Sequence, residues 1–321
     1  YSVKVEATGE PETSVAGRVP VVVVISPGPV YKFGEVNVTG LRRLRPSYVH
    51  NRFASLQGKN YSPDVLDEKF RELMRTGLFN VLQINPQPEG GNYLRLDIAA
   101  EEAKAKEFGV SVGYGSYEGA IFGIQFADRD LFGYGRPLFT SIEISQRGYK
   151  GEILWDDPHF LESNVELKVR LSALTFDYDG YSKFEIGART EFSYNITKQY
   201  QIGLFASQRH DEIISADIDD DLLGNMNYFV SSVGFFHTLD LRDSPVVPSR
   251  GFVFNQTFEL AASAIGSEIE YFRTTARASY FIPLGKTLLE FGARTSFASG
   301  TLTLDREETF LPYQYFLIFR K

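Results

Sequence analysis

Residues 184–197, FEIGARTEFSYNIT, decide the fold class of this chain. Every second position lies on a mostly apolar face, which carries Phe184, Ile186, Ala188, Thr190, Phe192, Tyr194 and Ile196. The positions between them are polar or glycine. A period of two predicts a β-strand and excludes an amphipathic helix. Because about 9–11 tilted residues let a strand cross a bilayer, this stretch is also long enough to span a membrane.

Strands of this kind repeat from Glu107 onward, with turn residues between them. The predicted spans are 108–117, 119–129, 137–147, 149–156, 164–176, 182–197, 199–210, 227–239, 251–262, 268–282 and 287–299. This series of about eleven alternating strands predicts an antiparallel transmembrane β-barrel. The connections are expected to alternate between short and long, as in barrels with tight periplasmic turns and longer outer loops.

The composition is compatible with a barrel and excludes several other classes. The sequence has no apolar run of about 18 residues, so a transmembrane helix is excluded. Its 27 phenylalanines and 18 tyrosines favour the aromatic girdles of membrane barrels. The absence of cysteine excludes disulfides and thiolate sites, and the net charge of −8 argues against a nucleic-acid partner. No signal peptide is visible, so Tyr1 is expected not to be the native start.

The residues before the strand series predict a small α+β module with the order β-α-α-β-β. Its expected elements are a strand over 31–39, a helix between Ser47 and Gly58, a helix between Ser62 and Gly77, and strands near 79–85 and 93–99. Serine is a common helix cap, and proline fits the first helical turn, so Ser47 and Ser62-Pro63 are the predicted helix starts. Residues 1–30 predict only a pair of strands, which we interpret as the end of a preceding copy of the module.

Three turns between strands have distinctive sequences. One contains Asp240-Leu241-Arg242-Asp243, followed by Pro248 and Gly251, although an ordinary turn with a surface ion pair accounts for the same residues. The second is DRDLFGYG at residues 128–135, and the third is WDDPHF at residues 155–160. Glycine and proline end the strands in both, next to aromatic residues typical of a membrane interface.

No catalytic residue, metal site or cofactor is predicted. The acidic residues Asp217, Asp219, Asp220 and Asp221 do not form a calcium loop, because Leu222 and Tyr228 occupy the positions that require glycine and glutamate. We interpret them as a solvated outer loop. His159 lies beside two aspartates, but neighbours along one turn seldom converge on one ion.

Enzymatic motifs are also missing from the sequence. No serine stands in a Gly-x-Ser-x-Gly elbow. Four carboxylates on the expected lumenal face, Glu143, Glu166, Glu185 and Glu191, are interpreted as polar lining rather than as an acid–base pair. The protein is therefore predicted not to be an enzyme.

Taken together, these motifs resemble those of the BamA/TamA family of outer-membrane protein assembly factors. The α+β module resembles a POTRA domain, including its step at Arg75-Thr76-Gly77-Leu78-Phe79. The turn residues that match family motifs are Leu131, Phe132, Gly133 and Gly135, then Asp157, Pro158 and Phe160, and finally Asp240, Arg242, Asp243, Pro248 and Gly251. The resemblance covers nearly the whole chain, with the motifs in the family's order.

This resemblance implies a domain organisation and a function. Residues 1–30 would end a preceding POTRA domain, 31–104 would form a POTRA domain in the periplasm, and 105–321 would form the N-terminal portion of the barrel. The implied function is folding and inserting β-barrel proteins into the outer membrane of a Gram-negative bacterium. Implied partners are unfolded outer-membrane proteins or autotransporters, outer-membrane lipid, and an accessory periplasmic or inner-membrane protein bound through POTRA domains.

One family feature is missing, which makes the chain resemble a partial barrel. The family has an Arg-Gly-Phe or Arg-Gly-Tyr loop after strand eleven and about five further strands. Here Arg250-Gly251-Phe252 lies in the preceding turn instead. An odd number of strands would also not close a barrel in the family's manner, so a chain truncated at both ends is expected.

The resemblance also implies a gate for client strands in the first barrel strand, which would pair weakly with the last and accept a client by β-augmentation. Its tentative residues are Phe108, Gly109, Gly113, Gly115 and Tyr117. Glycine weakens a strand, although these glycines would also relieve crowding in the lumen. The edge of the strand at 93–99 is a second expected site for extended clients.

Three other functions fit parts of the sequence. A secretion pore of the two-partner type would translocate a client instead of inserting it. A passive porin or lipid-transporting barrel would leave the α+β module without a role. A barrel enzyme would require catalytic side chains that converge at the outer rim, and the sequence shows none.

Overall fold

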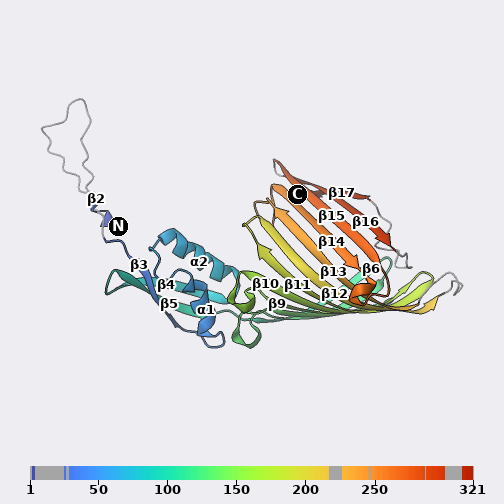
Figure 1. Ribbon diagram of the computed structural model, residues 1–321, viewed down its shortest axis with the longest axis horizontal. Coiled ribbons are helices and arrows are strands. Elements are labelled where there is room, and N and C mark those ends of the chain that lie inside the picture. The colour runs from blue at the N-terminus through green and yellow to red at the C-terminus, as the bar shows by residue number, and fades with distance from the viewer. Residues whose placement is uncertain are drawn as a thin grey trace, which may run out of the picture. The chain divides into compact units, whose positions relative to one another are not determined.

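The computed structural model describes residues 2–3, 25–26, 29–216, 226–245, 247–285, 287–300 and 313–320. They belong to two compact units, Tyr1–Lys104 and Ala105–Lys321 (Figure 1). The first unit combines helices with short strands, and the second is dominated by long strands. Neither helix among the described residues is long and apolar enough to cross a membrane.

The first unit has its elements in the order strand, helix, helix, strand, strand. They are β3 (Lys32–Thr39), α1 (Pro46–Ala54), α2 (Pro63–Arg75), β4 (Phe79–Glu89) and β5 (Tyr93–Glu102), preceded by the short antiparallel pair β1 (Ser2–Val3) and β2 (Ile25–Ser26). The rest of the strand pair predicted within residues 1–30 lies outside the described residues.

β5 is the central strand of the first unit's sheet, whose order is β3-β5-β4. It pairs in parallel with β3 and antiparallel with β4. The prediction that the strand at 93–99 offers a free edge to a client is therefore wrong. The chain crosses over through both helices before the β4–β5 hairpin, which leaves β3 and β4 as the edges.

Apolar side chains of both helices pack against the sheet to form the core of the first unit. Val49 and Phe53 of α1, and Leu66 and Leu73 of α2, are buried at the helical spacing expected of an amphipathic helix. α2 begins after Ser62 with Pro63 in its first turn, as predicted. The other predicted start is wrong. α1 is capped by Arg45 instead of Ser47, because Pro46 occupies the first helical position and places Ser47 inside the helix.

Glu102, at the end of β5, holds the connection between β3 and α1. Its carboxylate accepts hydrogen bonds from the backbone N–H groups of Arg42, Arg43 and Leu44, at 2.8, 2.9 and 2.8 Å. Burial acts to raise the pKa of Glu102, but these backbone donors lower it below its ordinary value. The Glu102 carboxylate thus satisfies three backbone N–H groups of residues that lie outside any helix or strand.

The second unit is a twelve-stranded antiparallel sheet whose order follows the sequence, from β6 to β17. Its strands are β6 (Lys106–Gly115), β7 (Gly119–Asp128), β8 (Leu138–Ser145), β9 (Gly148–Asp157), β10 (Val165–Tyr178), β11 (Tyr181–Asn195), β12 (Tyr200–Ala216), β13 (Asn227–Asp240), β14 (Gly251–Ala261), β15 (Tyr271–Leu284), β16 (Thr287–Gly300) and β17 (Tyr313–Arg320). Three short 3-10 helices lie in connections, namely η2 (Leu131–Gly133), η3 (Phe160–Glu162) and η4 (Ser263–Ile265).

The predicted antiparallel strands are confirmed, and each of the eleven spans overlaps one strand from β6 to β16. β17 is a twelfth strand that the prediction omitted. The described strand pairings leave β6 and β17 as the two edges of the sheet, so they show no closed barrel.

The expected alternation of short and long connections is found from β6 to β12, where the connections are 116–118, 129–137, 146–147, 158–164, 179–180 and 196–199, but it does not hold for the sheet as a whole. Consecutive strands are antiparallel, so successive connections fall at opposite ends of the sheet. The two-residue turns 146–147 and 179–180 share one end with the longer connection 262–270. At the opposite end, the turn 285–286 accompanies the connections 129–137 and 241–250.

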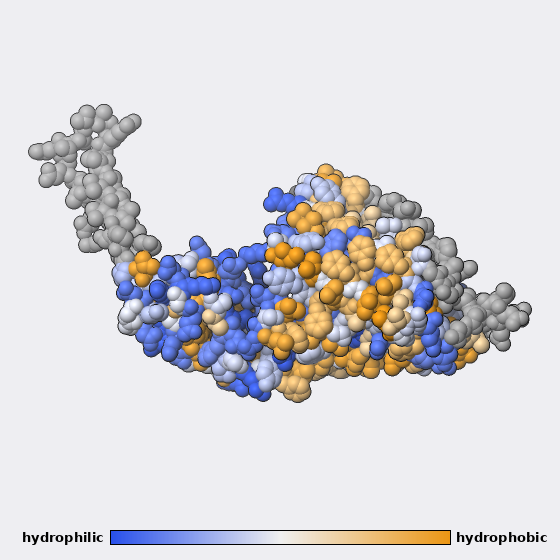
Figure 2. All heavy atoms as spheres, in the orientation of Figure 1, coloured by the Kyte–Doolittle hydropathy of each residue, from blue (hydrophilic) through white to orange (hydrophobic). Residues whose placement is uncertain are grey.

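The two faces of the sheet differ in chemistry. Since opposite residues of an antiparallel pair share a face, the registers place Phe108, Phe192 and Phe272 on one apolar face. In Figure 2 the surface over this unit is largely hydrophobic, whereas the surface of the first unit is largely hydrophilic. The other face carries charged residues such as Glu152, Arg189 and Glu259.

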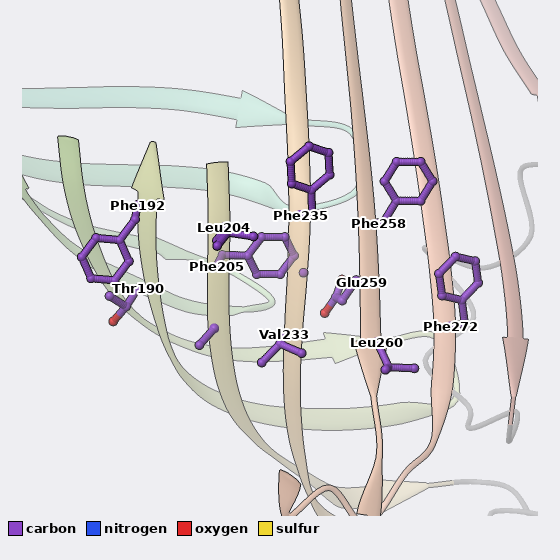
Figure 3. Close-up of a pocket in the computed structure, with 12 residues that line it drawn as sticks. Thr190, Phe192, Leu204, Phe205, Val233, Phe235, Phe258, Glu259, Leu260 and Phe272 are labelled. Carbon is purple, nitrogen blue, oxygen red and sulfur yellow. The ribbon is translucent and has the colours of Figure 1, made fainter. Parts of the chain in front are cut away.

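A depression on the apolar face illustrates its character (Figure 3). It has a volume of about 520 Å³ and is lined mainly by Phe192, Leu204, Val233, Phe235, Phe258, Leu260 and Phe272 from β11 to β15. Such a continuous and largely apolar surface is the kind that faces lipid in a transmembrane sheet. The charged face is then the one directed away from lipid.

Candidate functional site

β6 has one hydrogen-bonded neighbour, β7, and its opposite edge has no strand partner among the described residues. An unpaired edge presents a row of backbone N–H and C=O groups to any extended chain that approaches it. The predicted gate residues Phe108, Gly109, Gly113 and Gly115 all lie in this strand. The structure therefore brings four of the five together on one sheet edge.

No residue of β6 is buried. Its apolar face carries Phe108, Val110, Val112 and Tyr114, which are 71%, 66%, 83% and 81% exposed. On the same apolar face, side chains of central strands are less exposed, with Phe192 of β11 at 40%, Leu204 of β12 at 62% and Val233 of β13 at 43%. The difference fits the position of β6, which has a strand neighbour on one side only among the described residues. Few packing contacts therefore hold this strand in place.

The glycines of β6 do not owe their presence to crowding by the backbone. A side-chain carbon added at Gly113 would meet no atom within 4 Å. At Gly109 and Gly115 it would meet only the flexible side chains of Gln125 and Glu118. The alternative that these glycines relieve crowding thus has no support at Gly113. A weakly ordered strand fits better there, because glycine adds entropy cost and no packing.

Tyr117 lies outside the strand, contrary to its predicted place in the gate. β6 ends at Gly115, and Tyr117 belongs to the turn that leads to β7. Its ring centroid lies 6.0 Å from that of Phe176, and the Arg147 guanidinium lies 4.2 Å above it. These contacts hold Tyr117 against β10 and the β8–β9 turn, away from the free edge.

The three turns with family motifs lie at the same end of the sheet, where β6 begins. They connect β7 to β8, β9 to β10 and β13 to β14. Because connections alternate between the two ends, these three fall together, opposite the β6–β7 turn. The motifs are separate in the sequence, and the antiparallel topology brings all three to one end of the sheet, which we call the rim.

Two of these turns share one backbone conformation. Asp130 precedes η2 with φ −143° and ψ 64°, and His159 precedes η3 with φ −139° and ψ 57°. The middle residues Phe132 and Leu161 both adopt positive φ, at 58° and 52°. Both side chains are 79% exposed. A bulky residue in the left-handed region costs roughly 1–3 kcal/mol, so each turn is held in place by its surroundings.

Buried aspartates provide that support in the β7–β8 turn. Asp130 is 1% exposed and accepts a 2.7 Å hydrogen bond from the backbone N–H of Gly135. Its own backbone N–H donates to Asp128 at 3.0 Å. In this turn the aspartate carboxylates accept hydrogen bonds from backbone N–H groups. They thereby stabilise a tight conformation in which strand pairing provides no acceptor for these groups.

An ion pair joins the two similar turns. The Arg136 Nε lies 2.9 Å from an oxygen of Asp157, whose side chain is 5% exposed. The Arg136 guanidinium also lies 5.0 Å from the ring centre of Tyr134 and 6.0 Å from that of Trp155. The sequence alone did not predict this contact, because Arg136 lies outside the matched motifs. Only the strand register brings it close to Asp157.

The third motif turn is held by its own carboxylates. Arg242 donates two hydrogen bonds to Asp240, at 2.8 and 2.6 Å, in a bidentate arrangement. Asp243 accepts from the backbone N–H groups of Ser249 and Ser244 at 2.9 and 3.0 Å, and also from the Ser249 hydroxyl. Pro248 is buried, and Gly251 has φ 112°. This motif is therefore a closed structural turn with its polar groups satisfied internally.

The described residues provide no metal centre. They contain no group of three histidine, cysteine, aspartate or glutamate side chains placed to hold an ion. The His159 Nδ1 lies 3.3 Å from the Ser163 carbonyl, within the same turn. The acidic cluster at 217–221 lies outside the described residues.

Three of the four carboxylates considered as acid–base candidates are paired with basic side chains. Glu166 bonds Lys168 at 2.8 Å, Glu185 bonds Lys183 at 3.1 Å, and Glu191 bonds Arg189 at 3.0 Å. Glu143 stands opposite Lys150 in the register of β8 and β9. Each carboxylate thus has a cation nearby, as expected for the lining of a charged face.

Comparison with known proteins places the second unit in a described family. The sequence model of the Omp85 superfamily domain matches residues 104–318. Two curated relatives are outer membrane protein assembly factors BamA. That of Neisseria meningitidis serogroup B is 23% identical, with 86% of this chain and 37% of the relative covered. That of Neorickettsia risticii is 20% identical, with 78% and 35% covered. The chain thus spans little more than a third of these relatives.

Solved structures show the same fold. The crystal structure of BamA from Haemophilus ducreyi lacking POTRA domains 1–3 is similar with a TM-score of 0.77 and 14% identity, covering 94% of this chain and 61% of that one. CdiB from Acinetobacter baumannii is similar with a TM-score of 0.55 and 14% identity, covering 85% and 54%. At these identities the likeness extends to the fold alone.

Proposed function

The chain belongs to the Omp85 superfamily, which confirms the family its motifs resembled, and from this premise we propose that the protein folds and inserts β-barrel proteins into the outer membrane of a Gram-negative bacterium. The observation that carries the proposal is the free edge of β6, the edge without a strand partner among the described residues. A client strand would add to this edge by main-chain hydrogen bonds, which recognise an extended chain of almost any sequence. Clients would thus be unfolded outer-membrane proteins or autotransporters.

The chemistry of β6 suits such transient pairing. Val112 and Tyr114 on its apolar face would lie against lipid, so a client strand that pairs there would already stand at membrane depth. Gly113 and its neighbours keep the strand weakly packed, which lets it release the client after closure. No covalent chemistry on the client is involved, so we propose a protein that is not an enzyme.

The first unit would act as a periplasmic POTRA domain. Its β-α-α-β-β order and three-stranded sheet support that assignment. Its two edge strands, β3 and β4, are the places where an extended client or an accessory partner would add. Asn37 and Asp97 bond across β3 and β5 at 3.4 Å, so the exposed face of the sheet is polar at these two positions. The partner would thus pair through the backbone rather than through an apolar patch.

The experiment that tests the proposal measures client folding. Proteoliposomes that contain the full chain receive a urea-unfolded eight-stranded outer-membrane barrel. Folding is followed by heat-modifiable gel migration and by protease protection. We expect the initial rate to exceed that of protein-free liposomes by about tenfold or more, which corresponds to about 1.4 kcal/mol of barrier. An unchanged rate would overturn the proposal, and an unfolded client protected inside the vesicles would indicate the secretion pore.

A matched pair of variants connects the activity to the edge. Val112 of β6, Phe122 of β7 and Ile144 of β8 form one row across the sheet, so Val112 and Ile144 occupy matching register positions on its apolar face. Val112→Lys places a charge on the free edge, which discourages pairing. Ile144→Lys costs similar desolvation within the sheet and leaves the edge intact. The first variant should lose the rate enhancement, and the second should retain most of it.

A further inference from the structure

A cavity of about 720 Å³ lies on the charged face of the second unit. Its lining residues come from two groups of strands, β9–β11 and β14–β16, and are Leu154, Lys168, Arg170, Arg189, Glu191, Asn255, Thr257, Glu259, Arg273, Thr275, Arg277, Arg294 and Ser296. Six are basic and two are acidic. Strands well apart in the sheet order can line one cavity because the sheet curves toward its charged face (Figure 1).

Two pairs of arginines face each other across neighbouring strands within this lining. Arg170 of β10 is directly opposite Arg189 of β11, and Arg277 of β15 is directly opposite Arg294 of β16. Like charges at directly opposite positions destabilise a sheet. One pair belongs to each wall of the cavity. Arginine side chains therefore line both sides of the same space.

Carboxylates on the sheet hold several of these cations in position. Arg170 bonds Glu152 at 3.0 Å, Arg189 bonds Glu191 at 3.0 Å, and Arg273 bonds Glu259 at 2.8 Å. Arg189 also lies 3.5 Å above the ring of Phe205. These contacts orient the guanidinium groups, so their side-chain entropy is already reduced before any ligand arrives.

The cavity opposes the overall charge of the protein. The chain carries a net charge of −8, yet this cavity has six basic residues against four carboxylates, the two in its lining and those of Glu152 and Glu166, which bond Arg170 and Lys168. Arginine binds carboxylates through two parallel hydrogen bonds, and it does so more strongly where water is partly excluded. Local excess of arginine in a cavity on an acidic protein indicates a site for an anionic ligand.

We propose that this cavity binds an acidic segment of polypeptide, whose carboxylates pair with Arg277 and Arg294 on one wall and with Arg170 and Arg189 on the other. The choice of polypeptide over a small anion rests on the proposed function, which brings unfolded chains to this sheet. Asn255, Thr257, Thr275 and Ser296 add neutral donors and acceptors that suit peptide amides. A segment held by both walls would also stabilise the curvature of the sheet.

The test measures binding of a fluorescein-labelled decapeptide of alternating glutamate and glycine to the full chain in detergent, by fluorescence anisotropy. A matched peptide with glutamine for glutamate is the neutral comparison. We expect the acidic peptide to bind at least tenfold more tightly than the neutral one. The preference should weaken as salt rises from about 0.05 to 0.3 M, because these charges are partly exposed to solvent.

Variants locate the site. R277Q/R294Q should weaken acidic-peptide binding at least tenfold, and R170Q/R189Q on the opposite wall should do the same, which keeps the test valid if one variant fails to fold. K69Q/R71Q removes two cations from α2 in the first unit and should leave binding unchanged. Equal binding of both peptides, or equal loss in the α2 variant, would overturn the proposal.

A further comparison separates polypeptide from a small anion. Inorganic phosphate at the same concentration of negative charge should compete poorly with the acidic peptide. Full competition by phosphate would overturn the assignment to a polypeptide segment. Neither result depends on client insertion, so failure of this inference and failure of the proposed function are distinguishable. A protein that inserts clients normally but ignores the acidic peptide would contradict the inference alone.

Discussion

The guanidinium of Arg136 and the carboxylate of Asp157, 2.9 Å apart, tie two connections of the sheet that share the same strained backbone conformation. One connection exposes Phe132 and the other exposes Leu161. Both stand at the rim where the chain enters the sheet. This ion pair thus links two turns at the end of the sheet where β6, the strand that we propose receives the client, begins.

Removing the charge of Asp157 tests how much this ion pair contributes to the stability of the fold. Asp157→Asn leaves Arg136 without its ion partner while the 5% exposed position stays polar, so we expect a loss of about 1–3 kcal/mol in unfolding free energy. Urea unfolding in detergent, followed by fluorescence of Trp155, measures it. Trp155 is the only tryptophan and lies next to the pair.

The matched control is Asp179→Asn. Asp179 also pairs with an arginine, Arg147 at 2.7 Å, but its side chain is 75% exposed. Exposed pairs contribute little, so the change should stay within about 0.5 kcal/mol. Equal losses in the two variants would show that the Arg136–Asp157 pair has no special role in the rim.

A second prediction separates backbone strain from steric overlap at two glycines. Gly180 and Gly251 have similar φ values, 104° and 112°. A side-chain carbon at Gly180 meets no atom within 4 Å, whereas at Gly251 it would lie 2.4 Å from the Leu241 carbonyl oxygen. Gly180→Ala should cost roughly 1 kcal/mol from strain. Gly251→Ala should cost a further roughly 1–3 kcal/mol from overlap.

Circular dichroism during urea unfolding measures both variants. A Gly251→Ala variant no less stable than Gly180→Ala would contradict the assigned contact with Leu241. It would also show that the motif turn between β13 and β14 can shift without cost.

The third prediction concerns pH. Hydrogen bonds from the hydroxyl and the backbone N–H of Ser249, and from other backbone donors of the turn, lower the pKa of Asp243 from 3.8 to about 2. A carboxyl with a depressed pKa stabilises the folded state above its unfolded pKa and loses that contribution as the pH falls to its folded value. The stability difference between the wild type and Asp243→Asn should thus be constant above about pH 5 and disappear between about pH 4 and pH 2.

Thermal melting of both proteins across that pH range is the measurement. A difference that persists unchanged at pH 2, or that appears only below pH 4, would contradict the hydrogen-bonded role of Asp243. Asp179→Asn again provides a control, because the hydrogen bond described for Asp179 comes from the Arg147 guanidinium, at 2.7 Å.

The sequence predicted what depends on local periodicity. A period of two in residues such as 184–197 fixes a strand and its two faces without knowledge of its neighbours. The helix start at Ser62-Pro63 was equally local. Ser47 failed as a cap because Pro46 competes for the same helix start, and two adjacent signals cannot be ranked by propensity alone.

What the sequence missed depends on which strands are neighbours. The free edge predicted at 93–99 is the centre of its sheet, since the crossover through two helices brings β3 to its open side. Arg136 and Asp157, or Arg277 and Arg294, meet only once the register is known. Tyr117 does not belong to the predicted gate strand, because β6 ends at Gly115, earlier than the apolar pattern indicated.

The central claim is that a client strand pairs with the free edge of β6, and disulfide trapping tests it most directly. The chain has no cysteine, so Val112→Cys and Ile144→Cys each introduce a single thiol, at matching register positions of the sheet. A client with single cysteines along its terminal strand is added during folding under mild oxidation. Disulfides form only when the two Cα atoms are within about 7 Å, so the readout reports strand pairing.

We expect Val112→Cys to cross-link client positions with a period of two, and Ile144→Cys, on a strand paired at both edges, to give no such pattern. Cross-links of equal yield from both positions, or none from Val112→Cys while the client folds at its normal rate, would contradict the account.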